Sequence, residues 1–172
     1  KSTVQIKDDK NNFLSLANSR SRLRMTTLYY FAGMNNCLVA GTGNKVEDFG
    51  IGFYTKYGDG GVDISPIADL NKTDVFEISK ILGVIDKILE AKPTDGLWDD
   101  GRTDEDQIGA TYKELEWAMV QKDLNKKSID FKGRKKQVFE ILTILNKKNL
   151  HKMIPIPIYK VPKNLKQLQN SI

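Results

Sequence analysis

Apolar residues recur at helical spacing along much of the chain. From Phe13 to Ala32 they fall at intervals of three and four residues, which predicts a helix that ends near Gly33. Asn11 or Asn12 is the expected cap of this helix. The same spacing predicts further helices over residues 73–82, 84–91, 111–124 and 131–148. Three prolines beyond residue 154 exclude helix from the segment that follows.

Two short stretches favour extended structure. Cys37–Ala40 is an apolar run closed by Gly41, and it is the predicted buried strand. Val62–Ile67 is expected to be a short strand or an extended segment. Strands that alternate with helices are typical of an α/β fold, here with more helix than strand. One convincing strand cannot form a sheet, so we expect the missing strands to lie before Lys1, in a longer protein.

The charge is unevenly distributed. The whole chain has a net charge of +5, yet residues 118–172 hold 13 basic and 3 acidic residues, and residues 1–117 are net acidic. A basic segment is one mark of a nucleic-acid-binding protein, but few aromatic residues are interleaved with these charges. A solvated helix face, or a cationic wall beside an anionic small ligand, is therefore the favoured interpretation, and no nucleic-acid partner is expected.

The rest of the composition excludes several kinds of site and of protein. A single cysteine, Cys37, excludes an internal disulfide and a cysteine-built zinc site, and a single histidine, His151, excludes sites that need two. There is no apolar run of the length that crosses a bilayer, so neither a transmembrane helix nor a membrane partner is expected. The polar N-terminal residues do not resemble a signal peptide, which predicts a cytoplasmic protein.

A turn with two glycines follows the predicted buried strand. Gly41 and Gly43 allow close backbone approach to a ligand, and Thr42 adds a hydroxyl group between them. Glu47 supplies a carboxylate a few residues further on. Ligands of open parallel sheets bind beyond the carboxyl ends of strands, so this turn suits a phosphate or magnesium. A plain tight turn is an equally good interpretation of these residues alone.

A second glycine-rich segment, Tyr54–Asp63, carries both charge signs. Its closely spaced glycines do not favour helix or strand, and Lys56, Asp59 and Asp63 lie among them. A binding loop is favoured over a purely structural loop. The letters G-G-V-D resemble part of a pyrophosphate-binding loop, but Asp59 stands where that loop has serine, so we exclude this match.

Basic residues at the two ends of the chain are further candidates for contacts to an anionic ligand. Arg20 and Arg24 share one face of the first predicted helix, whereas Arg22 lies on another face. A basic helix surface explains them equally well. His151 and Lys152 follow the last predicted helix, where they suit either a phosphate contact or an exposed, purely structural position.

Residues 94–106 are acidic and contain few apolar side chains. Their six acids are Asp95, Asp99, Asp100, Asp104, Glu105 and Asp106. Like charges repel, so nothing local favours a compact form, and a loop is predicted throughout. We expect this loop to act as a lid that closes when a ligand binds; a surface connection without a role is the alternative.

Several motifs in a fixed order carry a resemblance to one family. They are N-x-x-x-R-x-R-M from Asn18, then G-T-G-N-K-x-E, G-F-Y-T-K-Y-G-D-G-G-x-D, P-I-x-D-L-x-K-T, K-P-T-D-G-L and T-D-E-D-x-I-G, followed by Tyr112 and a closing His-Lys pair. From about Ala17 to Pro157 the chain closely resembles the ammonia-dependent NAD synthetases. The resemblance implies a Rossmann-like α/β fold of the adenine nucleotide α-hydrolase type, with a parallel sheet flanked by helices, only part of which lies in this chain. Residues 1–172 then form the C-terminal part of a single synthetase domain, in a homodimeric enzyme.

The resemblance also implies a reaction and a set of binding residues. Members of the family amidate deamido-NAD with ammonia and ATP, giving NAD, AMP and pyrophosphate through an adenylated intermediate. The positions that match deamido-NAD contacts are Arg22, Lys56, Asp63, His151 and Lys152. Those that match ATP contacts are Thr42, Lys72 and Thr94, and Glu47 matches a ligand of Mg²⁺. The family's pyrophosphate loop is absent, so the alternative is a non-catalytic fragment that binds nucleotide or dimerises.

Overall fold

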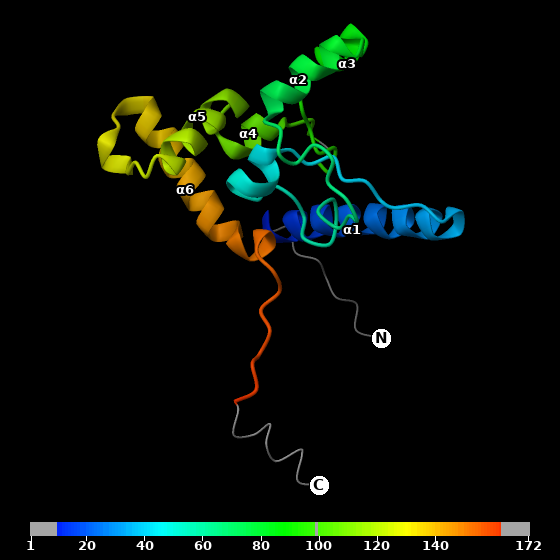
Figure 1. The fold of residues 1–172 in the computed structure, drawn as a ribbon. Coiled ribbons are helices and arrows are strands. Elements are labelled where there is room, and N and C mark those ends of the chain that lie inside the picture. Colours follow the sequence, from blue (N-terminus) through cyan, green and yellow to red (C-terminus); the bar gives the residue numbers. More distant parts are fainter. Residues whose placement is uncertain (1–9, 99, 163–172) are drawn as a thin grey trace.

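The computed structural model describes residues 10–98 and 100–162 (Figure 1). Their elements, in chain order, are α1 (Lys10–Asn35), the π-helix η1 (Val46–Ile51), α2 (Lys72–Ile81), α3 (Asp86–Leu89), α4 (Asp104–Ile108), α5 (Tyr112–Asp123), the 3₁₀ turn η2 (Ser128–Asp130) and α6 (Gly133–Met153). Helix is thus the main structure of the described residues. None of these helices is long and apolar enough to cross a membrane.

The first helix is longer than its sequence pattern predicts. It begins at Lys10, so Asn11 and Asn12 lie inside α1 and neither of them caps it. It also runs through Gly33 and ends at Asn35, because Asn36 adopts the left-handed conformation (φ 53°) that terminates a helix. Asparagine tolerates that conformation better than other residues with a side chain.

Local capping groups explain where the other helices begin. The helices predicted over 73–82 and 111–124 are confirmed as α2 and α5, whereas α3 is shorter than expected and α6 extends to Met153. Thr111 caps α5: its Oγ1 accepts from the N–H of Glu114 at 3.3 Å. The prediction of a loop through residue 106 is wrong at its end, because Thr103 caps α4 in the same way, accepting from the N–H of Asp106 at 3.1 Å.

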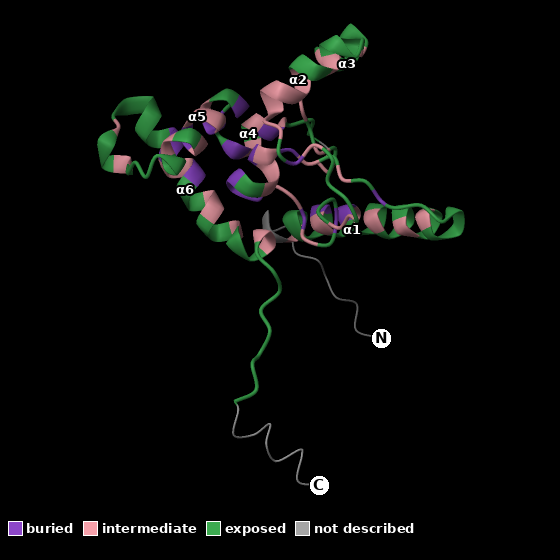
Figure 2. Ribbon diagram, in the orientation of Figure 1, coloured by how far each residue is buried: buried purple, intermediate pink, exposed green. Residues whose placement is uncertain are grey.

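The core lies where η1, α4, α5 and α6 meet (Figure 2). Helix α6 packs on both α5 and η1, and α5 also contacts η1 and α2. Leu115 of α5 and Leu142 of α6 are completely buried, as are Val46 and Ile51 of the π-helix. The π-helix is therefore held from two sides, and it presents its remaining face to the turn after Val39.

Extended structure is limited to one parallel bridge in the described residues, between Ala40 and Ile64. The N–H of Gly41 donates to the carbonyl of Ile64 at 2.7 Å, and that of Asp63 donates to the carbonyl of Val39 at 2.9 Å. Val39 is buried, but the rest of the predicted buried strand is exposed, because no neighbouring strand covers it here. The bridge has the parallel sense that an α/β fold requires, while the expected sheet stays a prediction.

Candidate functional site

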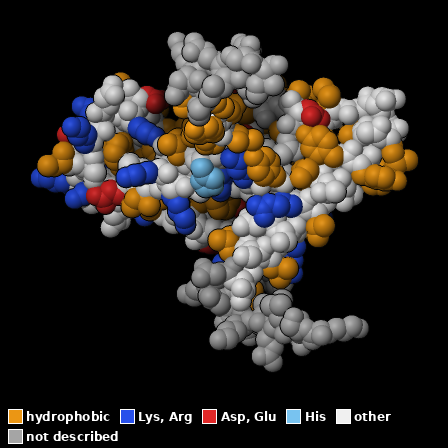
Figure 3. Space-filling model, turned by 90° about the horizontal axis from the view of Figure 1, so that it is seen from below, with side chains coloured by type: hydrophobic (Ala, Val, Ile, Leu, Met, Phe, Trp, Pro, Cys, Tyr) orange, Lys and Arg blue, Asp and Glu red, His pale blue; other side chains and the backbone are white. Residues whose placement is uncertain are grey.

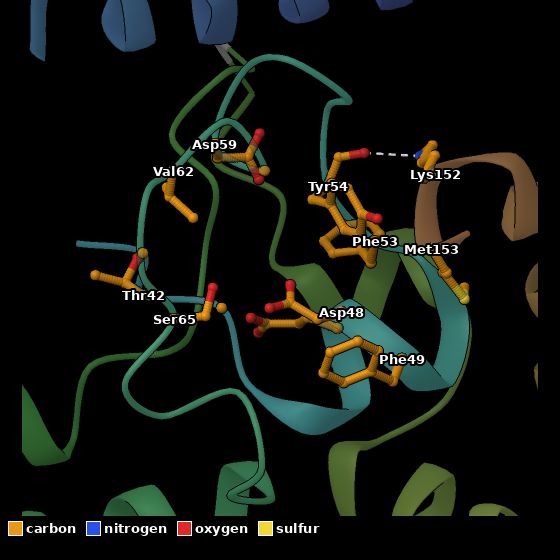
Figure 4. Close-up of a pocket in the computed structure, with 14 residues that line it drawn as sticks. Thr42, Asp48, Phe49, Phe53, Tyr54, Asp59, Val62, Ser65, Lys152 and Met153 are labelled. Carbon is orange, nitrogen blue, oxygen red and sulfur yellow. Dashed lines mark hydrogen bonds between the residues drawn. The ribbon is translucent and has the colours of Figure 1, made fainter. Parts of the chain in front are cut away.

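A cavity of about 240 Å³ lies between the glycine turn, η1, the second glycine-rich segment and the end of α6 (Figure 4). Thr42, Val62 and Ser65 line one side of it, and Phe53, Tyr54 and Lys152 line the other. Glu47, Asp48 and Asp59 place three carboxyl groups in the wall. The cavity therefore combines segments that are more than a hundred residues apart in the sequence.

The glycine turn can approach η1 because Gly43 has no side chain. A Cβ atom at this position would lie 2.3 Å from a carboxylate oxygen of Asp48, which no real contact allows. Asn44 is buried, and its Oδ1 accepts from the N–H groups of Val46 and Glu47 at 3.0 and 3.2 Å. These bonds fix the start of η1 and with it the position of Glu47.

Glu47 is the centre of a polar network behind the cavity. Its Oε1 accepts from the ammonium group of Lys72 at 3.1 Å and from the hydroxyl of Tyr112 at 2.5 Å. The ammonium group of Lys72 also lies 4.9 Å from the centre of the Tyr112 ring, in cation–π contact. The structure thus brings together the residue predicted to hold magnesium and a lysine predicted to bind ATP.

The network continues into the core through Tyr112. Its hydroxyl is 3.1 Å from Oδ2 of Asp104, a carboxyl that is almost fully buried and whose Oδ1 has no hydrogen-bond partner. Burial raises the pKa of Asp104, and burial beside two carboxyl groups raises the pKa of Tyr112. Tyr112 therefore keeps its proton at all ordinary pH values.

Asp48 is the most perturbed carboxyl in the cavity wall. Burial, together with the charges of Glu47 and Asp59, raises the pKa of Asp48 to about 6. A cation or a hydrogen-bond donor entering the cavity is therefore favoured electrostatically. A bare phosphate needs a counterion in this place, because like charges repel.

Asp59 shapes the second glycine-rich segment and ties it to α1. Its Oδ1 accepts from the Ser21 hydroxyl at 2.7 Å and from the N–H of Thr55 at 2.9 Å. A Cβ atom on Gly58 would lie 2.2 Å from Ser21 Oγ, so glycine is needed where the segment meets the helix. Asp59 and Gly58, which belong to the pattern that favours a binding loop, are therefore also needed to form the turn itself.

Three of the predicted deamido-NAD residues, Arg22, Lys56 and His151, are linked to one another beside the cavity, and Lys152 lines the cavity itself. The ammonium group of Lys56 donates to the carbonyl of His151 at 2.6 Å, and Arg22 Nε donates to the carbonyl of Lys56 at 3.3 Å. Lys152 donates to the carbonyls of Gly52 and Tyr54 at 2.9 and 2.7 Å, and burial lowers the pKa of Lys152. Figure 3 shows the face with the single histidine, which Lys, Arg and apolar side chains surround.

Asp63 and Thr94 lie outside the cavity lining, and neither belongs to the group around Lys56. The carboxylate of Asp63 accepts from the Tyr29 hydroxyl at 3.0 Å and from the N–H of Val39 at 2.8 Å, so it fastens the parallel bridge to α1. Thr94 lies in the loop before α4, where its hydroxyl donates to the carbonyl of Arg102 at 3.2 Å. Both assignments therefore stay predictions from the sequence.

The arginine series on α1 divides as the helical spacing predicts. Arg24 donates to the carbonyls of Asp95 and Gly96 at 3.1 and 2.9 Å, and Arg20 donates to that of Leu97 at 2.8 Å. Arg22 points to Lys56 instead. The two arginines of one face thus hold the loop that contains Thr94, which is a contact that the sequence pattern alone did not single out.

The donor set around Glu47 fits a magnesium ion that arrives with phosphate groups. Magnesium takes oxygen ligands and commonly uses one or two carboxylates together with substrate phosphates and waters. Glu47 supplies such a carboxylate at the cavity wall. Among the described residues no group of three or more His, Cys, Asp or Glu side chains forms a complete metal site, so an ion here needs phosphate ligands as well.

Sequence reasoning missed Asp104 and the role of the Tyr112 hydroxyl. Asp104 stands among the acids of a segment whose composition predicts a loop, whereas the structure buries it. The signal that identifies it is Thr103, three residues before Asp106: this spacing is a capping box, which begins a helix at Asp104.

The cavity joins two glycine-rich segments to carboxyl and ammonium groups, and comparison with known proteins identifies the family. The sequence profile of NAD synthase matches residues 1–155, so the chain belongs to the NAD synthase family. It is 49% identical over 121 residues to an NH(3)-dependent NAD(+) synthetase of Carboxydothermus hydrogenoformans, covering 70% of this chain and 49% of that one. It is 56% identical over 99 residues to the enzyme of that name from Methanococcoides burtonii, covering 58% and 37%.

Solved structures support the same fold. NMN synthetase from Francisella tularensis superposes with a TM-score of 0.71 at 34% identity, covering 88% of this chain and 57% of that one. An NH3-dependent NAD synthetase from Campylobacter jejuni gives 0.66 at 24% identity, covering 91% and 59%, and it bears on the fold alone. The chain spans about half the length of the curated relatives it matches.

Proposed function

We propose that the protein containing this chain forms NAD from deamido-NAD, ammonia and ATP, with AMP and pyrophosphate as the other products. The observation that carries the proposal is the identity of 45–56% to relatives named NH(3)-dependent NAD(+) synthetase. The contact between Lys72 and Glu47 beside the cavity adds support, because it pairs a cation with a carboxylate where ATP and magnesium are expected.

The proposed chemistry has two steps. The nicotinate carboxylate attacks the α-phosphorus of ATP, which expels pyrophosphate and leaves an acyl adenylate. Ammonia then attacks the acyl carbon, AMP leaves, and the nitrogen loses a proton to give the amide. A carboxylate is a poor electrophile, and the adenylate provides the leaving group that it lacks. A magnesium ion, when bound, neutralises phosphate charge as it develops.

The roles of this chain's residues in the proposal are binding and orientation. The proposed ATP contacts are Thr42, Lys72 and Thr94, and Glu47 is the proposed magnesium ligand. The proposed deamido-NAD contacts are Arg22, Lys56, Asp63, His151 and Lys152. Arg22 donates to the backbone of Lys56, and the Lys56 ammonium donates to the backbone of His151, so the three residues are neighbours, which supports a common anionic ligand.

The proposal extends to the whole protein. Residues 1–172 form the C-terminal part of one synthetase domain, whose Rossmann-like parallel sheet is completed by strands outside the described residues. The bridge between Ala40 and Ile64 supports this, because it is parallel. The enzyme is a cytoplasmic homodimer in this proposal, and the exposed apolar side chains of α1, such as Leu23 and Phe31, are consistent with a subunit contact.

The decisive assay uses the complete gene product with ATP, Mg²⁺, ammonium and deamido-NAD. NAD and AMP are expected in equal amounts, and NAD formed together with ADP would overturn the proposal. Glu47→Gln is expected to reduce the rate of adenylate formation strongly. Asp69→Asn, an acid-to-amide change at an exposed residue outside the cavity, is the matched control.

Two alternatives have their own outcomes in this assay. The similarity to an NMN synthetase makes deamido-NMN the competing acceptor, so both nucleotides are compared at equal concentration. The non-catalytic alternative is tested with the purified 172-residue chain. Because the family's pyrophosphate loop is absent from its sequence, we expect it to bind nucleotide with little or no turnover.

A further inference from the structure

Glu47 belongs to a polar network that also includes Lys72, Tyr112 and Asp104. The side chain of Glu47 is 15% exposed. One of its oxygens, Oε1, accepts hydrogen bonds from both the Lys72 ammonium and the Tyr112 hydroxyl. Among the hydrogen bonds of the described residues, its other oxygen, Oε2, has only a long contact of 3.4 Å, from the N–H of Asn44. The two oxygens of this carboxylate thus differ sharply in how many donors they have.

Counting protons assigns the hydrogen bonds of Tyr112. A phenol has one proton to donate, yet the Tyr112 oxygen lies within hydrogen-bond distance of two carboxyl groups, at 2.5 Å from Glu47 and 3.1 Å from Asp104. The shorter contact takes the phenolic proton, because charge-assisted bonds are the shorter ones. The longer contact, to Oδ2 of Asp104, holds the phenol oxygen from the side of the core.

The ring and the hydroxyl of Tyr112 have separate tasks. The ring packs in the buried core of η1, α4, α5 and α6, and it also lies against the ammonium group of Lys72. The hydroxyl contacts only acidic side chains among the hydrogen bonds of the described residues. Removing the hydroxyl while keeping the ring therefore changes the surroundings of Glu47 and leaves the packing intact.

The geometry points to Tyr112 as a positioning residue for Glu47: its hydroxyl, held from behind by Asp104, binds Oε1 so that Oε2 is the oxygen offered to a cation in the cavity. This inference rests on the proposed function for the metal-binding role of Glu47. Groups that orient a ligating carboxylate commonly change metal affinity by about 10- to 100-fold when they are removed.

The test is Tyr112→Phe in the complete gene product, with Mn²⁺ as the probe in the presence of ATP. Bound Mn²⁺ is measured by electron paramagnetic resonance, so the readout does not depend on turnover. We expect Mn²⁺ binding to weaken by about tenfold, with a melting temperature within a few degrees of wild type. Tyr30→Phe, which removes a hydroxyl from an exposed position on α1, is the matched control and is expected to bind Mn²⁺ as wild type does.

A double-mutant cycle separates positioning from a general effect on the fold. If Tyr112 acts through Glu47, adding Tyr112→Phe to Glu47→Gln produces no further loss of Mn²⁺ binding. Additive losses, or a Tyr112→Phe protein with the Mn²⁺ affinity of wild type, would overturn the inference. Asp104→Asn tests the same contacts without altering the tyrosine. It is expected to weaken binding less than Tyr112→Phe, and an equal or larger loss contradicts the proton assignment.

The results distinguish this inference from the proposed function. If NAD is not formed while the Mn²⁺ results hold, the reaction is wrong and the positioning role of Tyr112 stands. If NAD is formed but wild type binds no Mn²⁺ with ATP, or Glu47→Gln binds it normally, the positioning inference fails and the reaction stands.

Discussion

Helices α5 and α1 have similar sequence patterns but very different surroundings. The shorter helix, α5, buries Tyr112, Leu115 and Ala118 against α6 and η1. The longer helix, α1, has 26 residues, yet its apolar side chains stand largely in solvent: Leu23 is 68% exposed and Phe31 is 55% exposed. Figure 1 shows the same contrast, with α1 extending beyond the rest of the structure.

The difference shows what helical periodicity can and cannot predict. Spacing identifies a helix and its apolar face, because both depend on residues three or four apart. The partner of that face depends on residues far away in the sequence, or on another part of the protein. For α5 the partner lies in the described residues, whereas most apolar side chains of α1 are exposed there.

The largest expected effect tests the contrast directly. Leu115→Ala in α5 removes a completely buried side chain and is expected to lower the free energy of unfolding by about 2–5 kcal/mol. Leu28→Ala in α1, where the side chain is 57% exposed, is expected to cost less than about 1 kcal/mol in the 172-residue chain. Denaturant unfolding of both variants makes the measurement. Equal losses would show that α1 is packed as tightly as α5.

A smaller expected effect concerns how the contribution of Glu114, in α5, to the free energy of unfolding depends on pH. Hydrogen bonds from the Arg134 guanidinium, together with the helix cap at Thr111, lower the pKa of Glu114 to about 2 from its ordinary 4.5. Because the folded pKa is depressed, the contribution of Glu114 is complete above its unfolded pKa and is lost as the pH falls from about 5 to about 2. The residue is partly exposed, so we expect about 1 kcal/mol.

Glu114→Gln measures this contribution. The variant is expected to lose stability near neutral pH and to show a flatter fall in unfolding free energy below about pH 5 than wild type. Glu77→Gln in α2 is the matched control, since Glu77 is exposed. Parallel pH curves for wild type and Glu114→Gln would contradict the assigned ion pair.

The smallest effect lies on the open side of the molecule, at the loop before α4. Arg24 holds two carbonyl groups of this loop, so Arg24→Ala is expected to raise the rate of proteolysis between Trp98 and Arg102 by several-fold. Arg22→Ala, on another face of the same helix, is the control for cleavage. ATP with deamido-NAD is expected to slow cleavage of the wild-type protein. Equal rates with and without these ligands would contradict the predicted lid.

Some elements were predictable because their signals are local. Thr111 begins α5 and the prolines after residue 154 exclude helix, and both effects act within a few residues. The capping box at Thr103 is equally local, but the six acids of residues 94–106 favoured a loop over the helix that it begins. The predicted buried strand differs most from its prediction, because Cys37 and Leu38 are exposed. They need adjacent strands to cover them, and no local pattern indicates whether those strands are present.

The candidate site divides in the same way. A turn next to a strand predicted Thr42 and Glu47 at the cavity, and helical spacing predicted that Arg22 lies apart from Arg20 and Arg24. The link from Glu47 to Tyr112 joins residues 65 positions apart, so no spacing rule reports it. Contacts of this kind depend on the packing of α5 against η1.

The π-helix at Val46–Ile51 makes the length of this segment as important as its composition. A π-helix closes after five residues instead of four, so it accommodates one residue more than an α-turn. Both of its ends, Val46 and Ile51, are completely buried, and Glu47 lies between them at the cavity wall.

Deleting one residue would let an ordinary turn form, but it would rotate the following residues by about 100° relative to those before. Val46 and Ile51 could then no longer both stay in the core while Glu47 stays at the cavity wall. The segment should therefore reject insertions and deletions, and relatives that differ in length here are the ones in which to look for altered chemistry.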